Sequence, residues 1–108
     1  MNDTLLVITS APDRKIALTI ARELIERRLA ACVNVLGACD SIYRWQGQVE
    51  AARELPLLIK TRPAAYPDVE ATIRKLHPYE LPEIVLACKL DHVFKECLAD
   101  ALASPFGS

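Results

Sequence analysis

The chain has 108 residues, a length that fits a single domain spanning residues 1–108 and that suffices for a hydrophobic core without disulfides or metals to hold it. Its charge is nearly balanced, with 13 Lys and Arg against 14 Asp and Glu, so the basic excess that supports nucleic-acid binding is absent. No apolar segment approaches the roughly 20 residues of a membrane span, and the N-terminus lacks the basic lead and apolar stretch of a secretory signal, so we expect a cytoplasmic protein with no membrane partner.

The first elements are a short strand and an amphipathic helix. Residues 4–9 are apolar and largely β-branched, which is typical of a strand covered on both faces. Pro12 and Asp13 predict the start of a helix with Asp13 as its N-cap. Glu23 and Arg27 form an i,i+4 pair in the favourable order. The apolar residues at helical spacing predict one buried stripe, made of Ile16, Ala17, Ile20, Ala21, Leu24 and Ile25.

Two β-like segments, residues 31–43 and 49–61, flank a predicted tight hairpin loop at Trp45-Gln46-Gly47-Gln48. With a two-residue loop, Asp40 faces Arg53 as an opposite-charge pair, and Gly37 faces Pro56. Since Gly and Pro both interrupt strands, we expect the ribbon to bend or bulge at their level.

The length of this ribbon predicts self-association. Strands of about 13 to 15 residues reach on the order of 45 Å, whereas a domain of this size has a radius of gyration of about 13 Å. The ribbon must therefore curl or project, and its exposed edges need a partner. Sister subunits related by cyclic symmetry would close those edges, so we expect a homo-oligomer.

The second half of the chain completes an alternating pattern. Residues 63–76 predict a helix with Pro67 in its first turn and Pro78 after its end. Residues 83–88 predict a strand, and Asp91 caps a short last helix. The order is β-α-β-β-α-β plus a C-terminal helix, which predicts an α+β fold of the split β-α-β, or ferredoxin-like, type.

The four cysteines do not form a recognisable metal or redox motif. None of them stands in a Cys-x-x-Cys pair, so the sequence indicates neither a zinc knuckle nor a thioredoxin-like site. In a reducing cytosol we expect all of them to be buried small hydrophobes; they are Cys32, Cys39, Cys88 and Cys97.

The densest polar cluster is His77-Pro78-Tyr79-Glu80-Leu81-Pro82-Glu83, between the second helix and the last strand. Its two prolines stiffen the segment, and imidazole plus carboxylate suits Cu(II), Zn(II) or Ni(II). His77 and Glu83 are therefore candidate metal ligands, with a third ligand from another strand, a neighbouring subunit or water. The alternative is that both side chains only satisfy backbone groups at a helix end.

The predicted hairpin tip, Tyr43-Arg44-Trp45, carries the single tryptophan of the chain. A solvent-exposed Trp is costly, so we expect Trp45 to pack into a pocket or against a partner at a subunit interface. The alternative is that it folds back on its own domain.

No catalytic constellation is visible in the sequence. The serines Ser10, Ser41 and Ser104 lack a Gly-x-Ser-x-Gly setting, and three glycines do not make a phosphate-binding loop, so we expect no enzyme and no organic cofactor. An aromatic-rich segment of the kind that stacks RNA bases is also missing.

Four successive segments carry a family resemblance that runs from about Leu5 to Leu90. They resemble, in order and at the right separations, the motifs of the CutA family of divalent-cation tolerance proteins. The segments are Thr9-Ser10-Ala11-Pro12-Asp13, Leu29-Ala30-Ala31-Cys32-Val33-Asn34, Ser41-Ile42-Tyr43-Arg44-Trp45-Gln46-Gly47 and His77-Pro78-Tyr79-Glu80-Leu81-Pro82-Glu83.

The resemblance implies a trimer of ferredoxin-like subunits whose long hairpins pack around the threefold axis, with a shape similar to the PII signalling trimers. It also implies a metal site of cysteine, histidine and glutamate, and the last two match His77 and Glu83. The cysteine position holds Thr9, which removes a soft ligand and disfavours Cu(I). The last helix departs from the family as well, with Cys97 and Asp100 where many members carry aromatic residues.

Two functions remain open. The first is a homotrimeric, non-enzymatic metal-binding protein for tolerance to divalent cations such as Cu(II), using His77 and Glu83. The second is a PII-like sensor or adaptor that binds a small ligand in a cleft between subunits. The residues assigned to that cleft or interface are Tyr43, Trp45, Lys60 and Tyr79.

Overall fold

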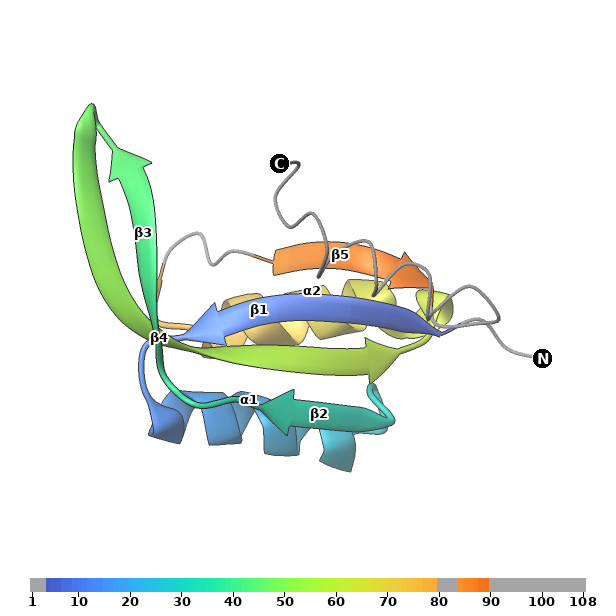
Figure 1. Cartoon of the computed structure of the whole chain (residues 1–108). Coiled ribbons are helices and arrows are strands. Elements are labelled where there is room, and N and C mark those ends of the chain that lie inside the picture. The colour runs from blue at the N-terminus through green and yellow to red at the C-terminus, as the bar shows by residue number, and fades with distance from the viewer. Residues whose placement is uncertain (1–3, 80–83, 90–108) are drawn as a thin grey trace.

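The computed structural model describes residues 4–79 and 84–89, and for residues 85–89 only the backbone. Two helices, five strands and one 3-10 turn occupy these ranges (Figure 1). In chain order they are β1 Leu5–Ala11, α1 Arg14–Glu26, β2 Cys32–Val35, β3 Cys39–Trp45, β4 Gln48–Thr61, the 3-10 turn Pro63–Ala65, α2 Tyr66–Leu76 and β5 Ile84–Lys89.

The strands form an antiparallel sheet in the order β2-β4-β1-β5, with β3 paired to the other half of β4. β1 and β4 are neighbours although helix α1 and two strands separate them in the chain. This arrangement confirms the α+β, split β-α-β fold expected from the alternation of elements. The predicted strand at 83–88 is observed as β5, one residue further along.

Both helices pack on one face of the sheet. Alternate residues of β1 and β4 point to this face, among them Val7, Leu57 and Ile59, each with no exposed surface. Ile20 of α1 and Ile73 of α2 are equally buried against them. Together with their neighbours these side chains form one hydrophobic core between the helices and the sheet.

Helix α1 begins as its sequence predicts. The Asp13 side chain accepts a hydrogen bond from the backbone N–H of Ile16 at 2.9 Å, so the N-cap is confirmed. The Glu23 and Arg27 pair is present at 3.9 Å. The predicted stripe is buried except at its margins, because Ile16 is half-buried and Ile25 is exposed.

The predicted strand at 31–43 is divided in two. Residues 36–38 belong to no strand, and the pairing with β4 shifts by one residue across them, from Asp40 opposite Arg53 to Val35 opposite Leu57. The predicted interruption is therefore confirmed, as is the pairing of Asp40 with Arg53. The predicted pairing of Gly37 with Pro56 is wrong. The chain between Val35 and Asp40 has one residue more than the facing stretch of β4. The N–H of Leu36 therefore donates a hydrogen bond to the Pro56 carbonyl at 2.9 Å.

At this level β4 bends, and its first half leaves the sheet together with β3 (Figure 1). We call residues 39–54 the ribbon and the remaining described residues the body. The tip is a two-residue turn in which Gln46 and Gly47 have φ of 50° and 78°. Positive φ at both central positions matches the twist of the strands, and Gly47 adopts it without strain.

The prediction that all cysteines are buried is wrong for two of them. Cys39 is exposed and Cys32 is half-buried. Cys39 lies on the ribbon, where no second layer of structure within the described ranges covers it, and Cys32 lies on the edge strand β2. The side chain of Cys88, all of Cys97 and the predicted last helix from Asp91 lie outside the described residues.

Candidate functional site

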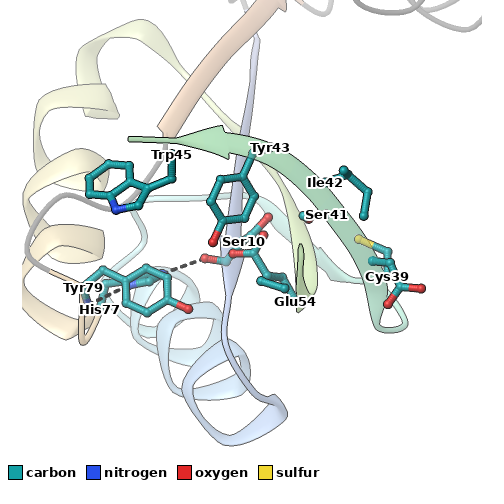
Figure 2. Close-up of a pocket in the computed structure, with 11 residues that line it drawn as sticks. Ser10, Cys39, Ser41, Ile42, Tyr43, Trp45, Glu54, His77 and Tyr79 are labelled. Atoms are coloured by element: carbon teal, nitrogen blue, oxygen red, sulfur yellow. Dashed lines mark hydrogen bonds between the residues drawn. The ribbon is translucent and has the colours of Figure 1, made fainter. Parts of the chain in front are cut away.

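A hollow of about 950 Å³ lies between the ribbon and the nearby end of the body (Figure 2). The ribbon supplies one wall, and the segment after α2 supplies the other, with Ser10 of β1 between them. The lining residues are Ser10, Cys39, Asp40, Ser41, Ile42, Tyr43, Trp45, Ala52, Glu54, His77 and Tyr79.

The period-two geometry of a strand places the ribbon side chains in this hollow. Cys39, Ser41, Tyr43 and Trp45 alternate along β3, so they share one face, and Glu54 joins them from β4 because it pairs with Cys39. Figure 2 shows the rings of Tyr43 and Trp45 on the same side of the ribbon. The bend of β4 turns this face toward the body.

His77 forms the floor of the hollow and joins two elements. It follows the last residue of α2, its side chain is only 7% exposed, and its Nε2 lies 2.7 Å from the carbonyl oxygen of Ser10. Its Nδ1 accepts a hydrogen bond from the backbone N–H of Tyr79 at 3.2 Å. Since a carbonyl only accepts and an N–H only donates, Nε2 carries the proton and the imidazole is neutral.

Tyr79 packs on this histidine. The two ring centroids are 4.6 Å apart with the rings tilted by 53°, which is a favourable arrangement for an aromatic pair. The Tyr79 side chain is still 46% exposed and lines the hollow beneath Trp45 and Tyr43 (Figure 2).

The charged side chains of the lining are carboxylates. Asp40 is 3.2 Å from the Arg53 guanidinium, so its charge is compensated. Glu54 forms no hydrogen bond or ion pair with any residue in the described part of the chain. Neither Lys nor Arg occurs among the described residues that line the hollow. The site therefore carries one uncompensated negative charge beside aromatic rings.

The structure brings together most of the residues that the sequence singled out. Tyr43, Trp45 and Tyr79 line one hollow with His77. Trp45 is 61% exposed, so it does not fold into the interior of its own domain. Lys60 lies elsewhere, in the body half of β4 between Leu6 and Cys32. Glu83 falls outside the described residues, as does the end of the segment that carries it.

Seven of the eleven lining residues were not assigned to a site from the sequence, among them Cys39, Glu54 and Ser10. Cys39 could have been found because it lies an even number of residues before Tyr43 on the same predicted strand. Glu54 could have been found because the predicted hairpin register places it beside Cys39. Ser10 could not, because it takes part through its backbone carbonyl, which carries no side-chain signal.

His77 fits the role of a metal ligand through one nitrogen. Histidine ligands commonly donate their other ring N–H to a backbone carbonyl, as His77 does to Ser10. Nδ1 would then be the ligand atom, in exchange for its longer hydrogen bond to Tyr79. No group of three His, Cys, Asp or Glu side chains suited to a metal occurs within residues 4–79 and 84–89, so further ligands would have to come from Glu83, water or another subunit.

Among the helices of the described ranges, none is long and apolar enough to cross a membrane.

Comparison with known proteins gives a consistent result. A family model described as CutA1 divalent ion tolerance protein matches residues 5–99. The divalent-cation tolerance protein CutA of Thermus thermophilus is 49% identical over 79 residues, covering 73% of this chain and 77% of that protein. A solved structure of the divalent cation tolerance protein from Thermus thermophilus has a TM-score of 0.79 at 43% identity, covering 89% of this chain and 92% of that one.

Two further relatives differ from these, one in its length and one in the compartment that its description names. Protein CutA of Mus musculus is 41% identical over 76 residues, a match that spans only 43% of its length. The structure from Archaeoglobus fulgidus, with a TM-score of 0.73 at 29% identity over 92% of this chain and 98% of that one, is described as a periplasmic divalent cation tolerance protein.

Proposed function

The chain belongs to the family of CutA1 divalent ion tolerance proteins, and from this premise we propose that it acts in divalent-cation tolerance as a homotrimer that binds cations such as Cu(II) without catalysing a reaction. The names of its relatives describe tolerance to cations and not a chemical conversion. The proposal has two separable parts, which are the assembly and the metal.

The observation that carries the assembly is the uncovered ribbon. Ile42, Trp45 and Val49 are between 61% and 67% exposed in the single chain, an unusual concentration of apolar surface on one short hairpin. Within the described part of the chain, two edges of the ribbon have no strand partner: the outer edge of β3, and the edge of the first half of β4 that is turned away from β3. Cyclic self-association would cover this apolar surface, which lies on both faces of the ribbon, and would pair the edges.

The metal part rests on His77 and Glu83. His77 holds a fixed ring orientation through its hydrogen bond to Ser10, so Nδ1 would bind the metal in place of the hydrogen bond that it accepts from the Tyr79 N–H. A carboxylate such as Glu83, four residues after Tyr79 in the chain, would be the second ligand, and a bound Cu(II) would supply Lewis-acid charge there. Water or a neighbouring subunit would complete the ligand set.

Calorimetric titration with Cu(II) tests this metal site. We expect saturable binding near one ion per subunit, and we expect His77→Ala to abolish it. The chain offers two matched controls: His92→Ala removes the only other histidine, and Cys39→Ser removes an exposed thiol that could take Cu(II) on its own. Binding that survives His77→Ala but is lost with either control would contradict the assignment of the metal to His77.

A second candidate function is favoured by the hollow itself. Its 950 Å³ and its three aromatic rings are suited to a small organic molecule, as in a PII-like sensor whose ligand lies in a cleft between subunits. In that case a metabolite, and not copper, would raise the melting temperature of the protein. A thermal-shift comparison of metal salts with small organic ligands separates the two functions.

For the compartment we propose the cytosol, because the exposed Cys39 thiol is suited to a reducing environment. Fractionation of cells that express the full-length protein would test this, and recovery in a periplasmic fraction would contradict it.

A further inference from the structure

We propose that the hollow between the ribbon and the body binds a small organic cation, an alkylammonium or quaternary ammonium group, held by the rings of Tyr43, Trp45 and Tyr79 and by the carboxylate of Glu54. This inference rests on the second candidate function and names its ligand class. It does not depend on whether a metal binds at His77.

The walls of the hollow supply the aromatic part of such a site. Trp45 and Tyr43 come from the ribbon, and Tyr79 comes from the segment after α2 on the opposite wall (Figure 2). An organic cation binds to the faces of Trp and Tyr by electrostatic attraction to the ring quadrupole, and several rings around one space form a cage for it. The three rings are between 46% and 61% exposed in the single chain, and a ligand reaches them where sister subunits leave the mouth of the hollow open.

The charged side chains around the hollow favour a positively charged ligand. Glu54 is uncompensated within the described part of the chain, whereas the charge of Asp40 is compensated by Arg53 at 3.2 Å. His77 is neutral in its hydrogen-bonding arrangement, and the described lining residues include neither Lys nor Arg. An anionic ligand such as a nucleotide phosphate would therefore meet no countercharge from these residues, while an ammonium group would gain both the carboxylate and the rings.

The single tryptophan makes the test direct, because Trp45 is both a wall of the hollow and the only indole fluorophore of the chain. Purified full-length protein in its native oligomeric state, treated with EDTA, is titrated with choline and separately with 3,3-dimethylbutan-1-ol, the neutral carbon isostere of choline. We expect choline to change the Trp45 emission saturably in the millimolar range. The isostere should bind at least about fivefold more weakly, because it lacks the charge.

Two substitutions test the two parts of the cage. Glu54→Gln keeps the size of the side chain and removes its charge, and Tyr79→Leu removes a ring from the wall opposite Trp45. We expect each to weaken choline binding by about two- to fivefold or more. The matched control is Glu50→Gln, since Glu50 is exposed on the same ribbon, opposite Tyr43, but does not line the hollow. It should leave binding unchanged.

Equal responses to choline and its isostere would overturn the proposal, as would an equal effect of Glu54→Gln and Glu50→Gln. An absence of any response, as when a sister subunit fills the hollow, would overturn it too. The proposed cation-tolerance function is judged separately by copper calorimetry and by the mass of the assembly. Loss of choline binding with copper binding intact would therefore reject this inference alone.

Discussion

Strand β4 runs through both regions of the molecule, and its two ends have opposite environments. In the body, Leu57 and Ile59 have no exposed surface, because α1 and α2 cover their face of the sheet. In the ribbon, Val49 is 67% exposed, and Trp45 on the other strand of the hairpin is 61% exposed. Both ends of β4 carry apolar residues, but within the described chain only those in the body are covered by other elements.

This difference shows that apolar residues in one strand can serve two different surfaces. The body contains the folding core and accounts for the stability of the single chain. The ribbon adds few residues to the hydrophobic core. Its exposed apolar side chains would stabilise the protein only when another molecule or subunit buries them. Substitutions in the two regions should therefore differ in size and in kind.

The largest effect is expected for Leu57→Ala. It removes a side chain with no exposed surface, so the free energy of unfolding should fall by about 2 to 5 kcal/mol per subunit. The matched substitution in the ribbon is Val49→Ala, which should act mainly on association and should make the melting temperature more sensitive to dilution. Urea unfolding at several protein concentrations measures both. A similar, concentration-independent loss for the two variants would remove the distinction between body and ribbon.

The next effect concerns the body residue that forms the floor of the hollow. His77→Phe keeps a ring but leaves the Ser10 carbonyl and the Tyr79 N–H without their partner, so we expect a loss of about 1 to 3 kcal/mol. Tyr79→Phe is the control, because the backbone N–H of residue 79 remains and the change should stay within about 0.5 kcal/mol. Equal stability of the two variants in urea would show that the hydrogen bonds of His77 do not hold the body together.

A smaller effect is expected at the ribbon tip. Gly47 has φ of 78°, so Gly47→Ala should cost about 1 kcal/mol from backbone strain alone, since nothing lies within 4 Å of the added methyl group. Gly37→Ala is the matched control, because that position also has open space but no positive φ. It should be neutral or slightly stabilising. The reverse order of the two variants in thermal unfolding would contradict the turn geometry.

The smallest effect is a pH dependence within the body. Burial raises the pKa of Tyr66, and the Glu70 carboxylate raises it further, with a partial offset from Arg74. The unfolded chain then loses this proton near pH 10, before the folded chain does. The free energy of unfolding should thus decline as the pH rises through about 10 toward the folded pKa, and be unaffected by this group below that range. Tyr66→Phe should remove this part of the decline in paired urea titrations, and identical profiles would contradict it.

Much of the fold, in the body and in the ribbon, was predictable from the sequence because its signals are local. The helical spacing of α1, the capping by Asp13 and the pairing of Asp40 with Arg53 each depend on residues close in the chain or joined by one turn. The interruption near Gly37 was predicted, but the one-residue shift in pairing across residues 36–38 was not, because the composition does not show which strand carries the extra residue. The exposure of Cys39 was missed because burial depends on which strands leave the sheet.

The candidate site was predictable only in part. Tyr43, Trp45 and Tyr79 stand out in the sequence as aromatic residues near a turn and a stiff loop. Their meeting in one hollow depends on the bend of β4 and on the hydrogen bond from His77 to Ser10, which joins residues 67 positions apart in the chain. Lys60, predicted to lie at an inter-subunit cleft or interface, is in the body half of β4, and its role there stays a prediction.

The central claim is that sister subunits cover the ribbon, and the mass of the assembly in solution tests it most directly. Light scattering on the full-length protein should give three times the mass of one chain. Trp45→Glu, which puts a charge on the exposed ribbon, should shift the mass toward the single chain or lower the melting temperature by several degrees. A wild-type protein with the mass of one chain at every concentration, or a Trp45→Glu variant with unchanged mass and melting, would contradict the account.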